Sequence, residues 1–235
     1  MDNFNTAEIK EFYENIDNVW PENDDWHYWN QKEIKKYIHS FKLHSGRILN
    51  AGSGGNTYDL SVDMYHVDIA ESKIKNTNKY VVSSIEEMPF EDNYFDVVIC
   101  VGSVINYCDA VKAISEMGRV LKHGGLLILE FENSYSFEFK NTKAYKASAA
   151  VVTTNYFNKS HRMWVYSLNY ICSIMHENKL IAGDFYPYHI LSGLVYFYNR
   201  NENKAAKYVW WDKIFRHLPI IRQYSGNMIL TGRKE

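Results

Sequence analysis

The stretch Arg47–Leu60 (RILNAGSGGNTYDL) constrains the fold of this chain more than any other. Its first four residues are typical of a short buried strand, and Gly52, Gly54 and Gly55 follow at once. Glycine lets a backbone turn sharply and lets a ligand approach it closely. From Thr57 we expect a short helix whose free N–H groups face that ligand. This pattern indicates a nucleotide-like cofactor, although a plain tight turn fits the same residues.

Downstream of the turn, predicted strands and helices alternate. Strands are expected at 65–69, 80–83, 97–101 and 126–131, and a helix from its N-cap Asp109 to Lys122. The strands are apolar runs, which favours a parallel sheet covered on both faces, with its ligand beyond the carboxyl ends of the strands. Those ends carry Asn50–Gly55, Asp68, Ser84–Ile85, Cys100–Ser103 and Glu130–Asn133.

Asp68 ends the second predicted strand. In dinucleotide-type sites, an acid at this point accepts hydrogen bonds from ribose hydroxyls. Asp68 follows Gly52 by 16 residues, whereas the usual spacing is about 20. We therefore expect a shortened first helix. The alternative is that Asp68 caps the helix that begins in AESKI.

Composition sets the remaining bounds. The 235 residues carry a net charge of −2, which gives no overall attraction to nucleic acid or to an anionic membrane. Cys100, Cys108 and Cys172 form no CxxC pair, so neither a disulfide framework nor a metal site is expected. The polar first residues and the lack of an apolar run of about 18 residues predict a cytoplasmic protein.

With these elements placed, residues 45–133 resemble the cofactor domain of the class I S-adenosylmethionine-dependent methyltransferases that often act on small molecules. The matching motifs are NAGSGGN, HVDIAESKI, SSIEEMPFEDNYFDVVICVGSVINY and EMGRVLKHGGLLILEFEN. They are contiguous and in the family's order. The resemblance implies S-adenosylmethionine as cofactor and S-adenosylhomocysteine as its product.

The resemblance also implies the cofactor contacts. Gly52 and Gly54 would lie under the methionine part and the ribose, Asp68 would bind the ribose hydroxyls, and Ile69 and the Ile85 backbone would meet the adenine. The full expected set is Asn50, Ala51, Gly52, Ser53, Gly54, Asp68, Ile69, Ser84, Ile85, Glu86, Cys100, Val101, Gly102 and Ser103.

Three positions depart from the family pattern. Asn50 stands where a carboxylate is usual, so any contact with the cofactor amino group is neutral. Asn56 replaces the third glycine, and asparagine also adopts positive φ. Ser84 stands where an acid commonly accepts a bond from the adenine amino group, a role that a hydroxyl fills more weakly. These changes leave open a relative that binds the cofactor without catalysis.

Methyl transfer from a sulfonium needs alignment, exclusion of water and, for some acceptors, removal of a proton. The candidate catalytic residues are Tyr107, Glu132 and His161. Each has a structural alternative: a core residue for Tyr107, a helix cap for Glu132 and a solvated loop for His161.

Aromatic-rich segments flank the predicted core. Helices at 6–19 and 31–41 are expected to form a lid, or simply to cover the sheet. In the region 134–179, Ser160 is expected to cap a helix that runs to His176. The basic, aromatic segment 204–224 fits an anionic substrate, a membrane surface or, by preference, a cover helix that buries Val209, Trp210, Ile214 and Phe215.

We therefore predict a single three-layer Rossmann-like α/β domain. Its mostly parallel seven-stranded sheet has an antiparallel edge strand. The domain also has an N-terminal helical lid (1–44), an insertion between strands five and six (134–179), and C-terminal strands and basic aromatic helices (180–235). The expected function is methyl transfer to an O or N nucleophile of a small molecule, by a monomer or homodimer, with no nucleic acid partner. The alternatives are a protein or nucleic-acid methyltransferase, an inactive cofactor-binding module and a nicotinamide dehydrogenase.

Overall fold

A seven-stranded sheet forms the centre of the computed structural model, which describes residues 6–19, 25–156 and 159–235. Its strands are β1 (Ile48–Ala51), β2 (Met64–Asp68), β3 (Tyr80–Val82), β4 (Phe95–Cys100), β5 (Leu121–Glu132), β8 (Leu180–Tyr188) and β9 (Asn227–Lys234). Their order is β3-β2-β1-β4-β5-β9-β8. β1 to β5 pair in parallel, and β9 runs antiparallel to both of its neighbours. The predicted α/β sheet is confirmed.

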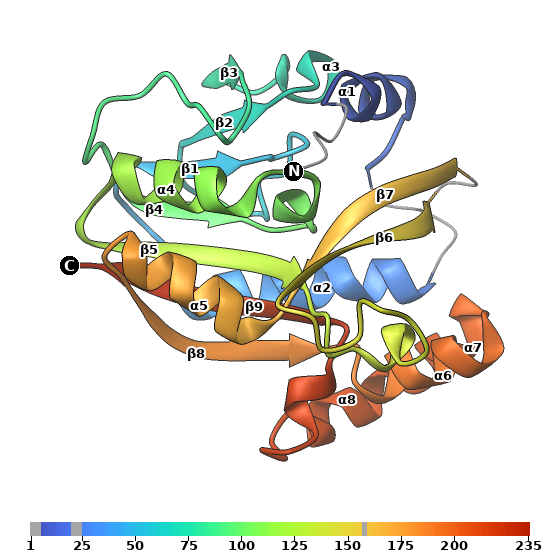
Figure 1. Cartoon of the computed structure of the whole chain (residues 1–235). Helices are drawn as coiled ribbons and strands as arrows, with labels where there is room; N and C mark the ends of the chain where they lie inside the picture. The colour runs from blue at the N-terminus through green and yellow to red at the C-terminus, as the bar shows by residue number, and fades with distance from the viewer. Residues whose placement is uncertain (1–5, 20–24, 157–158) are drawn as a thin grey trace.

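Helices cover both faces of this sheet, with α4 and α5 on one face and α2 on the other (Figure 1). The α-helices are α1 (Thr6–Asn15), α2 (Asp25–Ser40), α3 (Glu71–Ile74), α4 (Ala110–Val120), α5 (Leu168–Glu177), α6 (Leu191–Asn199), α7 (Glu202–Ala206) and α8 (Val209–Phe215). Short 3-10 helices are η1 (Val104–Tyr107), η2 (Phe137–Phe139) and η3 (Arg222–Tyr224).

The apolar runs of the strands serve two cores at once. Along β5, Leu126 and Ile128 pack in the core that contains Ile34 and Ile38 of α2. Leu127 and Leu129 point to the opposite core, which α4 and α5 complete. Because successive strand residues face opposite sides, a strand buried on both faces needs an unbroken apolar run.

The strand order reverses between β1 and β4: β2 and β3 are added on one side of β1, and β4 and β5 on the other. Ligands of open α/β sheets bind at such a switch point, beyond the strand ends. Around those ends lie α1 and a separate hairpin of β6 (Ala149–Tyr156) and β7 (Lys159–Tyr166) (Figure 1). The fold thus places a lid and an insertion where a ligand is expected.

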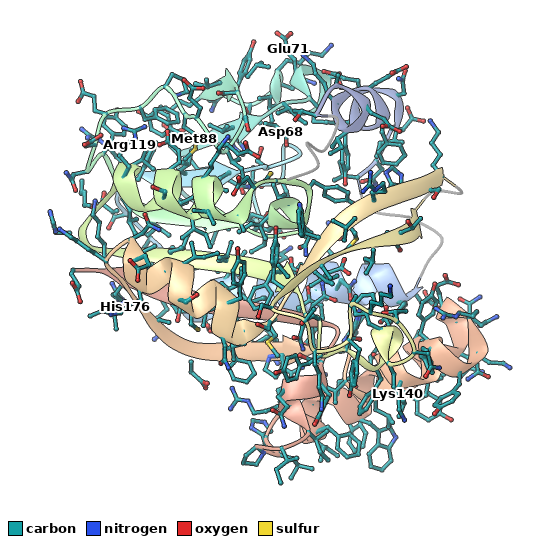
Figure 2. All side chains as sticks on the ribbon, in the orientation of Figure 1. Asp68, Glu71, Met88, Arg119, Lys140 and His176 are labelled. Carbon is teal, nitrogen blue, oxygen red and sulfur yellow. The ribbon has the colours of Figure 1, made fainter. Side chains whose placement is uncertain are left out.

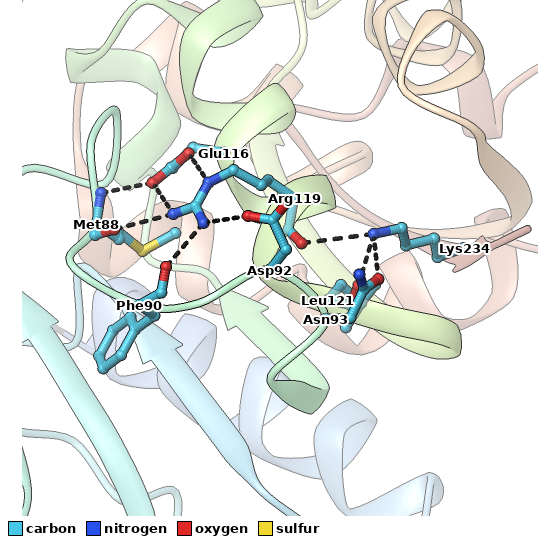
Figure 3. A network of polar contacts seen from close by, with 8 residues as sticks. All are labelled: Met88, Phe90, Asp92, Asn93, Glu116, Arg119, Leu121 and Lys234. Atoms are coloured by element: carbon cyan, nitrogen blue, oxygen red, sulfur yellow. Dashed lines mark hydrogen bonds and ion pairs between the residues drawn. The ribbon is translucent and has the colours of Figure 1, made fainter.

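A polar network joins the loop after β3 to the last turn of α4 (Figure 3). The Arg119 guanidinium donates to both Glu116 oxygens, at 2.8 and 2.7 Å, to Asp92 at 2.7 Å and to the Phe90 carbonyl at 2.7 Å. Lys234 of β9 donates to the carbonyl of Leu121 at 2.8 Å. These contacts hold the loop that carries Ile85 and Glu86 against α4.

No helix follows the glycine turn, so the expectation of a short helix from Thr57 was wrong. Tyr58 and Asp59 have φ of 52° and 53°, which a right-handed helix does not allow. Asn56 stabilises this turn instead, because its Oδ1 accepts from the Tyr58 N–H at 2.8 Å. The first helix of the core is α3, after β2.

The insertion differs from the predicted helix after Ser160. Ser160 lies in β7, opposite Asn155 of β6, and α5 begins only at Leu168 with Ser167 as its N-cap. The β-branched residues of the segment 151–154 favour the pleated geometry that the hairpin adopts.

The antiparallel strand is not at the edge, contrary to expectation. β9 lies between β5 and β8, and β8 forms the edge. The burial follows from this position: Met228, Ile229 and Leu230 of β9 are buried, whereas Ile181 of β8 is exposed.

The terminal helices also differ from expectation. α1 ends at Asn15 and not at residue 19, and α2 begins at Asp25 and not at residue 31. In α8, Trp210 and Ile214 are 57% and 43% exposed, contrary to prediction. Val209 is buried, as predicted, and Phe215 is half-buried. The inward face also carries Asp212 and the C-cap residue Arg216.

That inward face is polar because it completes two other elements. Asp212 accepts from Ser192 Oγ and the Leu191 N–H, each at 2.6 Å, and so caps α6. Arg216 donates to Glu33 of α2 at 2.7 Å. No helix in the described ranges is long and apolar enough to cross a membrane.

Candidate cofactor and acceptor cleft

One continuous cleft opens at the carboxyl ends of β1, β2, β4 and β5, bordered by α1, α2, the β6–β7 hairpin and the C-terminal helices. Eleven of the fourteen residues assigned to the cofactor by the resemblance line it. These are Gly52, Ser53, Gly54, Asp68, Ile69, Ser84, Ile85, Glu86, Val101, Gly102 and Ser103. We call this part of the cleft the cofactor half.

The glycine turn is fixed by hydrogen bonds to β2. The N–H groups of Gly52 and Ser53 both donate to the Val67 carbonyl, at 2.8 and 3.1 Å. Gly52 has φ of +69°, and a Cβ there would lie 2.3 Å from Val104 Cγ1. Both the backbone conformation and the close approach of η1 therefore require glycine at this position.

Asp68 lies at the end of β2 near α1 (Figure 2). Its Oδ2 accepts from the Gly54 N–H at 2.8 Å and its Oδ1 from the Ala70 N–H at 2.9 Å. Burial raises the pKa of Asp68, and these N–H groups oppose the rise. Each carboxylate oxygen keeps a second lone pair, so Asp68 can still accept hydrogen bonds from a diol at this position.

The opposite wall of the cofactor half combines two apolar side chains with a short polar loop. Ile69 and Ile85 line the cleft. Ser84 Oγ accepts from the Glu86 N–H at 3.1 Å, and Glu86 Oε1 accepts from the Asp109 N–H at 2.8 Å. Two isoleucines beside a carboxylate suit a ligand with a flat apolar part and a polar sugar.

Asn50, Ala51 and Cys100 do not line the cleft, although the resemblance placed them there. All three are fully buried in their strands. Asn50 Nδ2 donates to the Asn56 carbonyl at 2.7 Å and so supports the glycine turn from behind. A neutral amide suits this position because the group it meets is a backbone carbonyl.

The end of β4 is held by a buried acid that the sequence analysis did not single out. Gly102 and Ser103 both have positive φ, and their N–H groups donate to Glu130 Oε2. Tyr188 and Asn227 donate to the other oxygen of Glu130. With four donors, Glu130 positions the loop rather than reacting. The spacing of Glu130 and Glu132, on one face of a strand end, was the available signal.

The three catalytic candidates lie in different places. Tyr107 and Glu132 line the cleft. His161 is not among the lining residues. Its ring packs edge-on against the Phe12 ring of α1, with the ring centroids 4.3 Å apart, and its centroid lies 6.4 Å from that of the Tyr107 ring. This arrangement makes His161 a contact between hairpin and lid.

Glu132 is the most perturbed acid of the cleft. Its Oε1 accepts from Ser103 Oγ at 3.3 Å. Burial, followed by the nearby carboxylates of Glu138 and Glu130, raises the pKa of Glu132 to about 8. A group with this pKa takes up and releases protons near neutral pH.

Beyond the cofactor half, the cleft continues between aromatic side chains, of which Trp26 lies in the predicted lid (1–44) and His189 and Tyr196 lie in the segment 180–235. The Trp26 ring stacks on His189 at 4.3 Å and lies 4.5 Å from Tyr196. Asn30, one helical turn after Trp26, lines the cleft beside them. Their spacing of four residues on a helix was the only signal in the sequence.

Residues 45–129 match the family described as "Methyltransferase domain". Over 86 residues the chain is 36% identical to the ubiquinone/menaquinone biosynthesis C-methyltransferase of Francisella philomiragia, covering 34% of this chain and 34% of that enzyme. Residues 45–129 therefore carry a methyltransferase domain. The chain spans about a third of the length of the first of its curated relatives, so the match concerns the domain and not the whole enzyme.

Solved structures share the fold of the methyltransferase domain at low identity. The 1,6-didemethyltoxoflavin-N1-methyltransferase of Burkholderia thailandensis, solved with its substrate and S-adenosylhomocysteine, has a TM-score of 0.59 at 10% identity, covering 97% of this chain and 86% of that one. The cyclase SpnF has a TM-score of 0.61 at 14% identity, and the match covers 97% of this chain and 96% of that one. The fold therefore extends to proteins named for different reactions.

Proposed function

We propose that this protein transfers a methyl group from S-adenosylmethionine to an O or N nucleophile of a small molecule. The observation that carries the proposal is the cofactor half, where the Asp68 carboxylate, two isoleucines and the Gly52–Gly54 turn border one cleft at the switch point of the sheet. The match of residues 45–129 to a methyltransferase domain supports the same conclusion.

The residues present fit such a cofactor. Asp68 would accept bonds from the ribose hydroxyls, Ile69 and Ile85 would flank the adenine, and Gly102 and Ser103 would border the methionine part. When bound, S-adenosylmethionine supplies a methyl carbon already activated by a positive sulfur. The protein's task is then to align the acceptor, exclude water and accept a proton. Glu132 and Tyr107 line the cleft and are the candidates for the last role.

A small acceptor is supported by the lining of the cleft. α1, the β6–β7 hairpin and the C-terminal helices all contribute lining residues, so a small molecule there would be contacted from several sides. The net charge of −2 also disfavours a nucleic acid. The Burkholderia relative, an N-methyltransferase of a small heterocycle, supports the same class of acceptor. A cytoplasmic location belongs to this proposal.

Thermal unfolding with separate saturating S-adenosylmethionine, S-adenosylhomocysteine and NADH tests the cofactor. A ligand at 100 times its dissociation constant adds about 2.7 kcal/mol to the free energy of unfolding. We expect a shift with the two sulfur nucleosides only, lost in Asp68→Ala. Asp63→Ala is the matched control, because Asp63 precedes β2 and pairs with Lys79 at the surface.

Each other outcome has a defined meaning. A shift with NADH alone would establish a dehydrogenase and refute the proposal. No shift with any of the three would refute cofactor binding. A shift with S-adenosylhomocysteine but no methylated product from any acceptor would leave the cofactor-binding module in place of the enzyme.

A further inference from the structure

The inner part of the cleft, away from the cofactor half, has a distinctive wall. We define the acceptor wall as Trp26, Asn30, Glu132, Glu138, His189 and Tyr196, all of which line the cleft. The wall is continuous. A side chain at Gly226 would meet both His189 Cβ, at 3.1 Å, and Glu138 Oε1, at 3.5 Å, so these two residues are neighbours. His189 in turn stacks on Trp26.

Negative charge dominates the cleft. Among its described lining residues, the carboxylates are Asp68, Glu86, Glu130, Glu132, Glu138 and Glu202. The one lysine or arginine in the same set is Lys73, whose ammonium is bound to the Ile16 carbonyl beside the lid. An anionic acceptor such as a carboxylate or phosphate would therefore meet repulsion and no counter-charge.

Two other acids act on Glu132. Burial raises its pKa most, and the carboxylates of Glu138 and Glu130 add to the rise. Glu130 is fully occupied by four donors, whereas the Glu132 carboxylate accepts from Ser103 Oγ at the long distance of 3.3 Å. A ligand cation between Glu132 and Glu138 would relieve this repulsion.

Two further features of the wall favour a cation with an attached apolar group. The rings of Trp26 and Tyr196 line the cleft, and aromatic rings attract cations as well as apolar substituents. Asn30 Oδ1 is buried and has no hydrogen-bond partner within the described ranges, so it is an acceptor available to a ligand donor. An acceptor atom without a partner is costly in a buried place unless a ligand supplies the donor.

We propose that the methyl acceptor is an amine that enters the cleft as an ammonium ion, between the Glu132 and Glu138 carboxylates and beside the aromatic rings of Trp26 and Tyr196. The inference rests on the proposed methyltransferase function and narrows its acceptor from O or N nucleophiles to a protonated amine nitrogen.

The transfer needs only the ammonium, Glu132 and the cofactor. The bound cation lowers the raised pKa of Glu132, which loses its own proton to solvent on binding. The ammonium nitrogen then gives one proton to the Glu132 carboxylate and becomes a neutral amine. Its lone pair then forms the new N–C bond to the methyl carbon, while the C–S bond breaks and its electron pair stays on sulfur as a neutral thioether. The positive charge moves from sulfur to nitrogen, and Glu132 later releases its proton to solvent.

The test uses matched compounds that differ in charge but share a skeleton. With S-adenosylhomocysteine saturating, the further thermal shift is measured for phenethylamine, 2-phenylethanol and phenylacetate, and for hexylamine, hexanol and hexanoate. We expect the amine to give the largest shift in at least one series. Glu138→Gln should weaken amine binding about tenfold, because it removes one charged hydrogen-bond acceptor. Glu177→Gln, an exposed carboxylate of α5 outside the cleft, should change nothing.

The outcomes separate this inference from the proposed function. Loss of the S-adenosylhomocysteine shift itself would refute the function. If that shift is present but the alcohol or the carboxylate exceeds the amine in both series, or no amine adds a shift, the amine proposal is wrong while the function stands. Equal amine binding by Glu138→Gln and the parent protein would also overturn it.

Discussion

At the scale of single residues, the closest backbone approach in the cofactor half is at Gly52. Gly52→Ala should destabilise the protein strongly, because its Cβ would lie 2.3 Å from Val104 Cγ1 and because φ is +69°. Gly124→Ala is the matched control: its φ is +75°, but nothing lies within 4 Å of a Cβ there. In urea denaturation, Gly124→Ala should lower the free energy of unfolding by about 1 kcal/mol, which is the cost of the left-handed backbone. Gly52→Ala should lower it by more. Equal losses would contradict the steric explanation.

Glu132 gives a prediction for the pH dependence of stability. Its pKa is raised in the folded state to about 8, from an ordinary value of 4.5. The folded state therefore binds more protons between these values, and its stability falls as the pH rises through this window. Glu132→Gln removes that contribution. The melting temperature of the variant relative to the parent should rise between pH 5 and pH 8, and a constant difference would show that Glu132 titrates normally.

At the scale of elements, α1 joins the two sides of the cleft. Ile9 and Tyr13 line the cleft, Phe12 contacts His161 of the hairpin, and Glu14 accepts from the Ser72 N–H of α3 at 3.1 Å. A ligand under this helix adds contacts to its inner face. S-adenosylhomocysteine should therefore slow hydrogen exchange in a peptide covering 6–19, measured by mass spectrometry.

Phe12→Ala should weaken this protection, because it removes the buried contact to the hairpin while sparing the lining residues. Glu11→Ala is its control, since Glu11 is an exposed neighbour. Unchanged exchange on ligand addition would show that α1 does not close over the cleft.

At the scale of the whole molecule, a buried ion pair connects the C-terminal helices to α2. Arg216 and Glu33 are 8% and 3% exposed, and Tyr186 of β8 also donates to Glu33, at 2.6 Å. Arg216→Ala should cost about 3–5 kcal/mol, because removal of one partner leaves a buried charge. In denaturant unfolding, the double variant Arg216→Met with Glu33→Met should lose less unfolding free energy than Arg216→Ala. If the losses at the two positions simply add up in the double variant, Arg216 and Glu33 do not stabilise each other as a buried ion pair.

The sequence predicted the parallel core well, because strands 97–101 and 126–131 are continuous apolar runs between turn residues, and local pattern determines such elements. It failed where long-range contacts decide. Trp210 reads as core by helical periodicity, but the inward face of α8 serves Glu33 and the start of α6. The acceptor wall was likewise hidden, because Trp26, Glu138 and His189 meet only after three separate segments fold.

The position of β9 has a consequence for biosynthesis. β5 leaves the ribosome well before β9, and the hairpin, β8 and the helices α5 to α8 are made in between. Until β9 arrives, the nascent chain exposes the open edge of β5 and has no place for β8. An unpaired apolar edge invites pairing with other chains. Slow translation of residues 180–226 would lengthen this interval and so favour aggregation.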